Sequence, residues 1–303
     1  MKSLGFIGEC MLELRQRDDH FIMGYGGDVF NAAVYATRTG ANAFFISAIG
    51  DDHYSSYLLD AWQKEGVNVE TVRVIPHASP ALYIIETDDG GERSFSYWRD
   101  SSPFKSLLKP GNYLDTLSST LAGLDCIYFS GISLAVLPEV DRETLLDILK
   151  STRSSGKQVA FDPNYRPKLW SSREEALKWI DLAYSVSDIA LPSFDDELEL
   201  RGAESKDHLI NQLKELGPEE IVVKHGKLGA MVSINNETTT HDADVVETVI
   251  DTTAAGDSFN GAYLAHRMAG VDACAAAKIG CRVAGTVIQH QGAIIPDSVS
   301  LLS

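Results

Sequence analysis

Short apolar segments alternate with longer amphipathic segments along most of the chain. The short segments have the length of buried strands, and the longer ones place apolar residues at helical spacing. Repeated strand–helix units with buried strands predict an α/β fold with a doubly wound, mostly parallel sheet flanked by helices. The expected strands are 4–8, 44–49, 126–130, 158–162, 189–192, 220–224, 230–234 and 245–250. The expected helices are 55–65, 142–155, 174–187 and 207–216, with others starting near 30, 257 and 272.

Two segments depart from this rhythm. Residues 10–23 and 68–99 alternate apolar and polar positions, and Asp-Asp-Gly-Gly at 88–91 is a hairpin signal. They predict a small antiparallel sheet outside the main one. Because a few strands with one apolar face are not stable alone, this sheet should cover a cleft, pair with another subunit, or both. No linker, repeat or low-complexity tract divides the rest, so we expect a single domain over residues 1–303.

Composition narrows the class of protein. The chain is 44% hydrophobic and 23% charged, which is typical of a globular protein, and its net charge of -17 argues against binding nucleic acid or an anionic membrane. The first apolar run is too short for a signal peptide and none approaches 18 residues, so we expect a soluble, cytoplasmic protein. The four cysteines lack C-x-x-C spacing, which favours reduced thiols over a zinc site.

Residues 245–265 carry the clearest candidate chemistry. A β-branched run ends at Asp251, small residues fill 254–256, and helical spacing begins at Asp257. Such a turn leaves the amides of the helix start uncovered, and together with the helix dipole they favour an anion such as a transferring phosphoryl group. Asp257 could then accept a proton from a hydroxyl nucleophile. An ordinary N-cap aspartate explains the spacing alone at least as well.

The nine residues 251–259, Asp-Thr-Thr-Ala-Ala-Gly-Asp-Ser-Phe, resemble the C-terminal signature of the ribokinase-like (PfkB) sugar kinases. In that family the Gly-Asp pair forms the anion hole and the catalytic base. The resemblance implies that Asp257 is the base and that Ala255 and Gly256 form the anion hole. It also implies ATP and Mg²⁺ as cofactors, a ribokinase-like fold, and a small sheet that is a lid over the sugar and often a contact in a homo-oligomer.

The segment 24–31, Gly-Tyr-Gly-Gly-Asp-Val-Phe-Asn, opens the first long helix. Its glycines permit close approach of a ligand, and Asp28 and Asn31 could bind sugar hydroxyls. Taken alone, the segment is somewhat better explained as a flexible turn with an N-cap. The segment matches the Gly-Gly-x-x-x-Asn sugar-binding pattern of the PfkB kinases, which implies that Gly26, Gly27, Asp28 and Asn31 contact the sugar.

Arginine and aromatic residues mark two further candidate positions. Tyr83, Tyr97 and Arg99 lie in the predicted lid, where an arginine beside aromatic rings suits a ligand with a carbon backbone and a negative group. Asn164 and Arg166 follow the strand 158–162, and ligands of doubly wound sheets bind at the carboxyl ends of strands. Arg166 could be a surface residue, but its fork of donors suits a carboxylate.

Further segments are similar to the bacterial 2-keto-3-deoxygluconate kinases, a group within this family. They are 8–14, 26–28, 83–87, 91–93, 97–99, 130–135, 164–167 with 169–170, and 287–289 with 292–296. The similarity implies transfer of the ATP γ-phosphoryl group to the 6-hydroxyl of the sugar acid, with Gly27, Tyr83, Arg99 and Arg166 contacting it. The alternatives are a fructokinase or another PfkB sugar kinase, and a non-catalytic sugar or nucleotide sensor. No G-x-G-x-x-G follows the first strand, which argues against a dinucleotide dehydrogenase.

The nucleotide must be held without a Walker motif, which the sequence lacks. Residues 223–230 carry a Gly-x-x-Gly turn that a plain hairpin would also explain. The resemblance implies an ATP site lined by Ser193, Lys224, Gly226, Gly229, Ala254, Ala255 and Gly256. Residues 193–197, Ser-Phe-Asp-Asp-Glu, stand where many relatives have an Asn-x-x-Glu motif that orders Mg²⁺ and phosphate through water. Asp196 or Glu197 could take that carboxylate role, and no direct metal ligand is expected.

Overall fold

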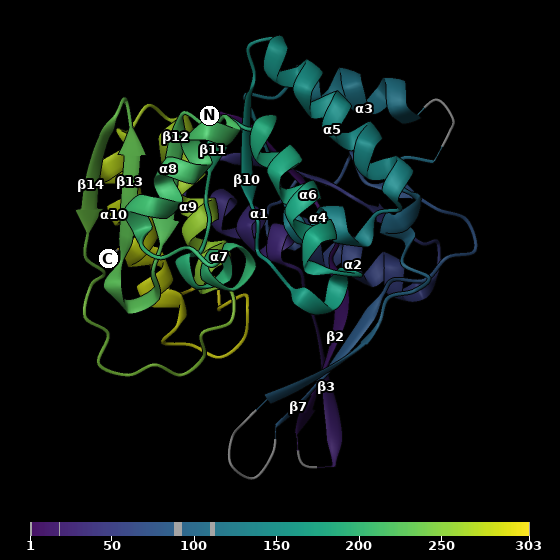
Figure 1. Ribbon diagram of the computed structural model, residues 1–303. Helices are drawn as coiled ribbons and strands as arrows, with labels where there is room; N and C mark the ends of the chain where they lie inside the picture. The colour runs from purple at the N-terminus through teal and green to yellow at the C-terminus, as the bar shows by residue number, and fades with distance from the viewer. Residues whose placement is uncertain (1, 18, 88–92, 110–112, 303) are drawn as a thin grey trace.

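An eight-stranded sheet forms the centre of the computed structural model, which describes residues 2–17, 19–87, 93–109 and 113–302 (Figure 1). Its strand order is β14-β13-β12-β11-β10-β9-β1-β4, and the strands from β4 to β12 run parallel, as predicted. The bounds are β1 Ser3–Ile7, β4 Asn42–Ile46, β9 Cys126–Ser130, β10 Gln158–Asp162, β11 Ile189–Ala190, β12 Glu220–Lys224, β13 Ala230–Ile234 and β14 Glu237–His241. The antiparallel strands β13 and β14 complete one edge.

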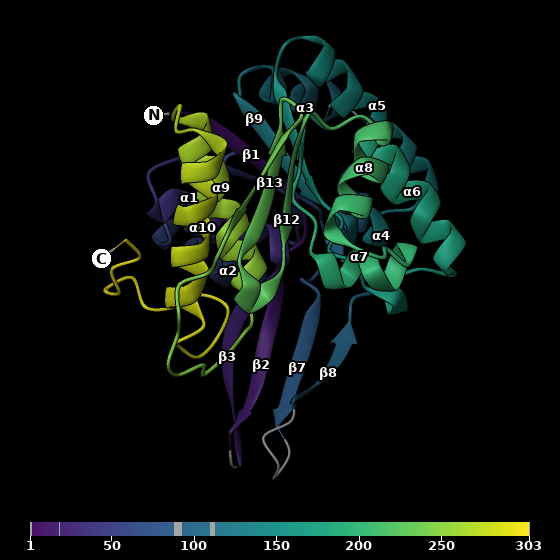
Figure 2. The ribbon, with the colours of Figure 1, turned by 60° about the vertical axis from the view of Figure 1, so that its left-hand side comes forward.

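Helices cover both faces of this sheet (Figure 2). One face carries α1 (Asp28–Arg38), α2 (His53–Lys64), α9 (Ala255–Met268) and α10 (Ala273–Val287). The other carries α3 (Tyr113–Ala122), α4 (Gly131–Val136), α5 (Glu139–Ser154), α6 (Arg173–Ser185), α7 (Phe194–Arg201) and α8 (Lys206–Leu216). Successive strand residues such as Phe6 and Ile7 enter different apolar clusters, because side chains alternate across a strand. Both faces are therefore buried, as the apolar strands predict.

Helices α1 and α9 pack unusually closely. A Cβ atom on Gly261 would lie 2.2 Å from the carbonyl oxygen of Ala32, so only glycine fits at this crossing. The close approach places the start of α9 beside the start of α1. Both helix starts carry residues that the sequence singles out.

A second, four-stranded sheet projects from the main body as the predicted lid (Figure 1). Its order is β3 (His20–Gly26), β2 (Met11–Arg17), β7 (Leu82–Thr87) and β8 (Arg93–Trp98). The outer pairs are antiparallel, whereas the central pair β2–β7 is parallel, because the chain returns to β7 through a long crossover. The hairpin signal at 88–91 lies outside the described residues. A short parallel pair joins β5 (Ala48–Ile49) to β6 (Arg73–Val74).

Several predicted element boundaries are corrected by the structure. The apolar run 245–250 forms no strand, and Val245 is 94% exposed. The edge strand on this side of the sheet is β14, whose polar threonines do not stand out as an apolar run. The predicted strand 44–49 is divided into β4 and β5, since Ala48 and Ile49 pair with β6 instead. Helices α3, α4 and α7 were not predicted.

The described helices include none with both the length and the apolar character needed to cross a membrane.

Candidate active site

The start of α9 meets the carboxyl ends of β10 and β12. Its N-cap residue is Ala254, in the left-handed conformation at φ 60, and no side chain caps the helix. Asp257 lies in the first turn rather than at the N-cap, so it is free of the capping role that its spacing alone favours. Uncapped amides at a helix start form an anion-binding site.

Asp257 is tied to α1 by a hydrogen bond. The side-chain amide of Asn31 donates to Asp257 Oδ2 at 2.8 Å, so two predicted site residues far apart in the sequence lie together. The other amide atom, Asn31 Oδ1, is buried without a hydrogen-bond partner among the described residues. A buried acceptor of this kind is expected to bind a donor such as a sugar hydroxyl.

The surroundings of Asp257 raise the pKa of its carboxyl group to about 7. Burial is the largest cause, and the negative charges of Asp28 and then Asp162 act in the same direction. The hydrogen bond from Asn31 and the positive charge of Lys224 lower the pKa. A carboxylate that gains a proton near neutral pH is well suited to general-base catalysis.

Asp28 begins α1, next to the predicted sugar-binding glycines. It accepts a hydrogen bond from the side-chain amide of Asn164 at 2.8 Å. A Cβ atom on Gly27 would lie 2.1 Å from the carbonyl oxygen of Glu9, and one on Gly26 would lie 2.6 Å from the hydroxyl of Tyr83. Glycine is therefore required at 27 by the backbone alone, and the structure groups both glycines with the lid.

The lid contributes a tyrosine and an arginine, each held by a buried glutamate. The hydroxyl of Tyr83 donates to Glu13 Oε2 at 2.5 Å, and Arg99 pairs with Glu9, which also accepts a hydrogen bond from Ser102. Arg99 Nε is buried without a partner among the described residues. Glu9 and Glu13 were missed by sequence reasoning, because a glutamate in a strand segment looks like a solvent-facing position.

Tyr97 remains 53% exposed and lies 6.0 Å from Tyr83 between ring centroids. Arg166 is also exposed, and its guanidinium donates to the carbonyl of Tyr165 and pairs with Asp196 at 3.5 Å. Both side chains are exposed, so a ligand can reach them. Burial raises the pKa of Asp196, while Arg166 lowers it.

The two candidate Mg²⁺-ordering carboxylates have different surroundings. Glu197 is fully buried, accepts a hydrogen bond from Tyr184 and pairs with Arg201. Asp196 instead is partly exposed and faces Arg166. The geometry thus favours Asp196. Ser193, the N-cap residue of α7, forms an isolated parallel β-bridge with Lys224 through the backbone.

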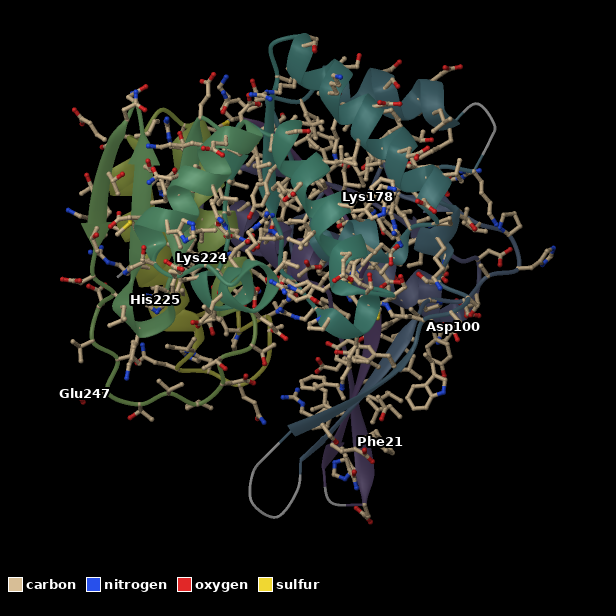
Figure 3. The ribbon with its side chains drawn as sticks, in the orientation of Figure 1. Phe21, Asp100, Lys178, Lys224, His225 and Glu247 are labelled. Atoms are coloured by element: carbon tan, nitrogen blue, oxygen red, sulfur yellow. The ribbon has the colours of Figure 1, made fainter. Side chains whose placement is uncertain are left out.

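Lys224 ends β12 inside the main body (Figure 3). Its ammonium group pairs with Asp162 Oδ2 at 2.5 Å and donates to Asn260 Oδ1 at 3.0 Å. Asn260 also bonds to Tyr128. Sequence reasoning missed Asn260 and Tyr128, although Asn260 lies three residues after Asp257, a spacing that puts two helical residues on neighbouring positions of one face.

The turn after Lys224 is the plain hairpin that the glycine spacing allows. It joins β12 to the antiparallel β13 through one short 3₁₀ turn, Gly226–Leu228. Gly229 has φ 84, and a Cβ there would lie 2.0 Å from the carbonyl of His241, so this glycine is needed for packing against β14. Gly226 has φ 48 and faces open space. Contact of Gly226 and Gly229 with a nucleotide stays a prediction.

The family model for pfkB carbohydrate kinases matches residues 1–299, almost the whole chain. The chain belongs to the PfkB family of carbohydrate kinases. A protein of Dickeya dadantii named 2-dehydro-3-deoxygluconokinase is 41% identical over 302 residues, covering 97% of each chain. A protein of Escherichia coli K12 with the same name is also 41% identical, over 303 residues and 97% of each chain.

The fold of this PfkB chain agrees with that of solved relatives. The crystal structure of 2-dehydro-3-deoxygluconokinase from Thermotoga maritima superposes with a TM-score of 0.85. The match covers 99% of this chain and 97% of the other, at 20% sequence identity. The ribokinase-like architecture is therefore confirmed, including the sheet, its helices and the lid.

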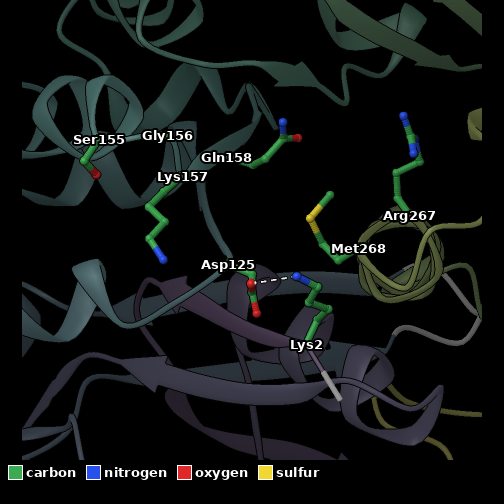
Figure 4. A pocket seen from close by; sticks show the side chains of 8 residues that line it. All are labelled: Lys2, Asp125, Ser155, Gly156, Lys157, Gln158, Arg267 and Met268. Atoms are coloured by element: carbon green, nitrogen blue, oxygen red, sulfur yellow. Dashed lines mark hydrogen bonds and ion pairs between the residues drawn. The ribbon is translucent and has the colours of Figure 1, made fainter.

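A cavity of about 490 Å³ lies away from the candidate active site (Figure 4). Its lining includes Lys2, Asp125 and Gln158, which stand at the amino ends of β1, β9 and β10, and Met268 at the end of α9. Asp257 and Lys224 stand at the opposite ends of their elements. The cavity is thus separate from the residues that the family signature marks.

Proposed function

We propose that this chain is an ATP-dependent sugar-acid kinase acting on 2-keto-3-deoxygluconate, the compound also named 2-dehydro-3-deoxygluconate. The product is 2-keto-3-deoxy-6-phosphogluconate. The observation that carries the proposal is Asp257, a carboxylate with a raised pKa in the first turn of a helix whose start has no side-chain cap. The names of relatives that are 41% identical over 97% of the chain support the choice of substrate.

The described residues fit an ATP phosphate chain. The start of α9 has no side-chain cap, so the turn Ala254–Gly256 can offer amide donors, chiefly that of Gly256, and Lys224 adds a cation nearby. Gly226 leaves open space beside it. Mg²⁺ would arrive with ATP and neutralise charge on the phosphate oxygens, and we assign Asp196 to the water shell around it because carboxylate oxygens suit this hard cation.

Asp257 acts as the base. It takes the proton from the 6-hydroxyl as this oxygen bonds to the γ-phosphorus, and the bond from that phosphorus to the bridging oxygen of ADP breaks. The amides of Gly256 and Asp257 stabilise the charge on the transferring group, because they are already oriented before the reaction starts. The amide of Ala255 donates to the carbonyl of Thr252 at 3.3 Å and would have to exchange that partner to take part. The lid excludes water that would otherwise hydrolyse ATP.

Two arginines give a reason for a sugar acid rather than a neutral sugar. Arg99 pairs with Glu9 and has one further donor, the buried Nε, without a partner among the described residues, and Arg166 is exposed beside Asp196. Guanidinium groups bind carboxylates through two parallel hydrogen bonds. A neutral ketohexose such as fructose has no carboxylate and would leave both arginines without this partner, so we prefer the sugar acid over the fructokinase alternative.

A coupled ADP-release assay with Mg-ATP tests the proposal. The substrates are 2-keto-3-deoxygluconate, its galacto epimer, fructose, ribose and gluconate, each below saturation so that kcat/KM is ranked. We expect the keto-deoxy acids to lead by at least 100-fold. If fructose leads, the kinase chemistry stands and the substrate is wrong. If no sugar is phosphorylated, the chain is better explained as a sensor.

We also propose that the lid joins two copies of the chain into a homo-oligomer, at least a dimer. The lid carries exposed apolar side chains at Phe21, Met23 and Trp98, with Phe21 toward its free end (Figure 3). Exposed apolar surface of this kind commonly marks an interface. Sedimentation should show a dimer or larger that Phe21→Asp with Met23→Asp dissociates, and a monomeric wild type would contradict the proposal.

The whole chain is proposed to work as a single kinase domain, because the family model spans it and both large apolar clusters share one sheet. Its place would be the cytoplasm, where ATP is available.

A further inference from the structure

Lys224 carries a buried positive charge directly beneath the start of α9. Its side chain is 11% exposed, and its ammonium group lies 3.6 Å from the position that a Cβ on Gly256 would occupy. Burying a charged group is costly unless an opposite charge compensates it. Asp162 supplies that opposite charge at 2.5 Å.

Asn260 fixes the position of this pair. Its amide nitrogen donates to Asp162 Oδ2 at 2.6 Å and to the hydroxyl of Tyr128 at 3.0 Å, and its oxygen accepts from Lys224 at 3.0 Å. Turning the amide over would place its oxygen against the carboxylate and its NH₂ against the ammonium. Both contacts would be repulsive, so only one orientation satisfies the network.

Both carboxylate oxygens of Asp162 accept hydrogen bonds. Its Oδ1 accepts the backbone N–H of Asn164 at 3.0 Å, while Oδ2 receives Lys224 and Asn260. Among the described residues, the hydrogen bonds of the Lys224 ammonium group are those to Asp162 and Asn260, which leaves its third hydrogen for a ligand. Gly256 has no side chain to block that approach.

We propose that Lys224 contacts the transferring phosphoryl group, and that Asp162, Asn260 and Tyr128 are positioning residues that hold its ammonium at the anion hole. The inference rests on the proposed kinase function and deepens it. A fixed charge in a site with little water stabilises developing negative charge strongly, because nothing must reorient during the reaction. The helix start alone offers only about half a unit of positive charge.

Charged groups from four neighbouring elements also face this region. They are Asp28 on α1, Asp162 on β10, Asp196 on α7 and Asp257 on α9, with Arg166 beside Asp196. Lys224 is the buried cation among these carboxylates in the described chain. Removing its charge should therefore leave Asp257 harder to ionise, which is an effect that a purely structural lysine far from the base would not produce.

The variant Lys224→Met tests the inference, with Lys227→Met in the adjacent turn as the matched control. We expect kcat to fall at least 100-fold while KM for the sugar acid changes less than about threefold. The acid side of the kcat/KM profile should move to higher pH. The control should keep both values. A Lys224→Met enzyme with kcat within threefold of wild type and an unmoved profile would overturn the inference.

Tyr128→Phe keeps the ring and removes one hydroxyl from the network, so it decides the case if Lys224→Met does not fold. We expect a fall in kcat of roughly threefold to tenfold, as for loss of one hydrogen bond, with the same direction of pH shift. Wild-type kcat and profile would overturn the positioning role. If wild-type protein itself releases no ADP with the sugar acid, it is the proposed function that fails, since Lys224 is then not yet under test.

Discussion

The side-chain amide of Asn31 donates a hydrogen bond to the Asp257 carboxylate at 2.8 Å, across 226 positions of sequence. This contact joins the starts of α1 and α9, and it brings the proposed sugar site to the proposed base. It exists because Gly261 lets the two helices touch through their backbones. The reaction geometry therefore depends on helix packing as much as on the reacting groups.

Asp257→Asn should fold normally and lose at least two decades of turnover. The amide keeps the shape of the side chain but cannot accept the proton, and removing a well-placed base costs about 10²–10⁴-fold in rate. The measurement is kcat in the ADP-release assay, with circular dichroism as the check on folding. Turnover near that of wild type would remove Asp257 from the proposed role.

The same substitution should stabilise the protein above neutral pH. Because the folded state raises the pKa of this carboxyl to about 7, its protonated form is favoured on folding, and that stability is lost as pH rises through 7. An amide cannot ionise, so the Asp257→Asn variant does not lose this stability as pH rises. We expect a gain on the order of 1 kcal/mol at pH 8, reduced by solvent screening and fading toward pH 4. Urea unfolding at both pH values measures it, and an equal difference at the two would contradict the raised pKa.

Asp28→Asn should move the acid side of the activity profile to lower pH. The charge of Asp28 raises the pKa of Asp257, so without it the base stays ionised at lower pH, by roughly one pH unit or less. The profile of kcat/KM against pH reports the free enzyme. Asp195→Asn, an exposed position on α7, is the control and should leave the profile in place. A shift of the Asp28→Asn profile to higher pH would show that the two carboxylates do not interact as described.

Gly261→Ala should destabilise the fold and slow the reaction together. The added methyl group would lie 2.2 Å from a backbone oxygen of α1, and such overpacking costs about 1–3 kcal/mol. It also pushes Asn31 away from Asp257. Gly285→Ala in α10 is the matched control, because its methyl group meets only Val246 at 3.4 Å, and helix propensity predicts a gain of about 0.5–1 kcal/mol. Unfolding midpoints and kcat for both variants provide the comparison.

Sequence patterning predicted the main sheet and the location of the lid because those features depend on apolar periodicity, which is visible locally. The strand expected at 245–250 failed for the opposite reason. Its β-branched residues have high strand propensity, yet the edge strand of the sheet is β14, which is rich in threonine. Tertiary pairing, rather than propensity, decides which segment forms a strand.

The proposed site was partly visible in the same way. The glycine-rich segments mark backbone positions that need special geometry, and Asp257 and Asn31 stand beside them. Glu9, Asn260 and Tyr128 gave no such signal, because a buried polar residue within an apolar stretch looks like an interruption until its partner is known. Partners that lie 93 and 132 positions apart cannot be paired from spacing alone.

The parallel seam between β2 and β7 has a mechanical consequence. Antiparallel pairing joins β2 to β3 and β7 to β8, and the parallel seam joins these two strand pairs into one sheet. The hydroxyl–carboxylate bond between Tyr83 and Glu13 crosses it. Two strand pairs joined in this way should move as one unit, so we expect the whole lid to close over the substrate in one step.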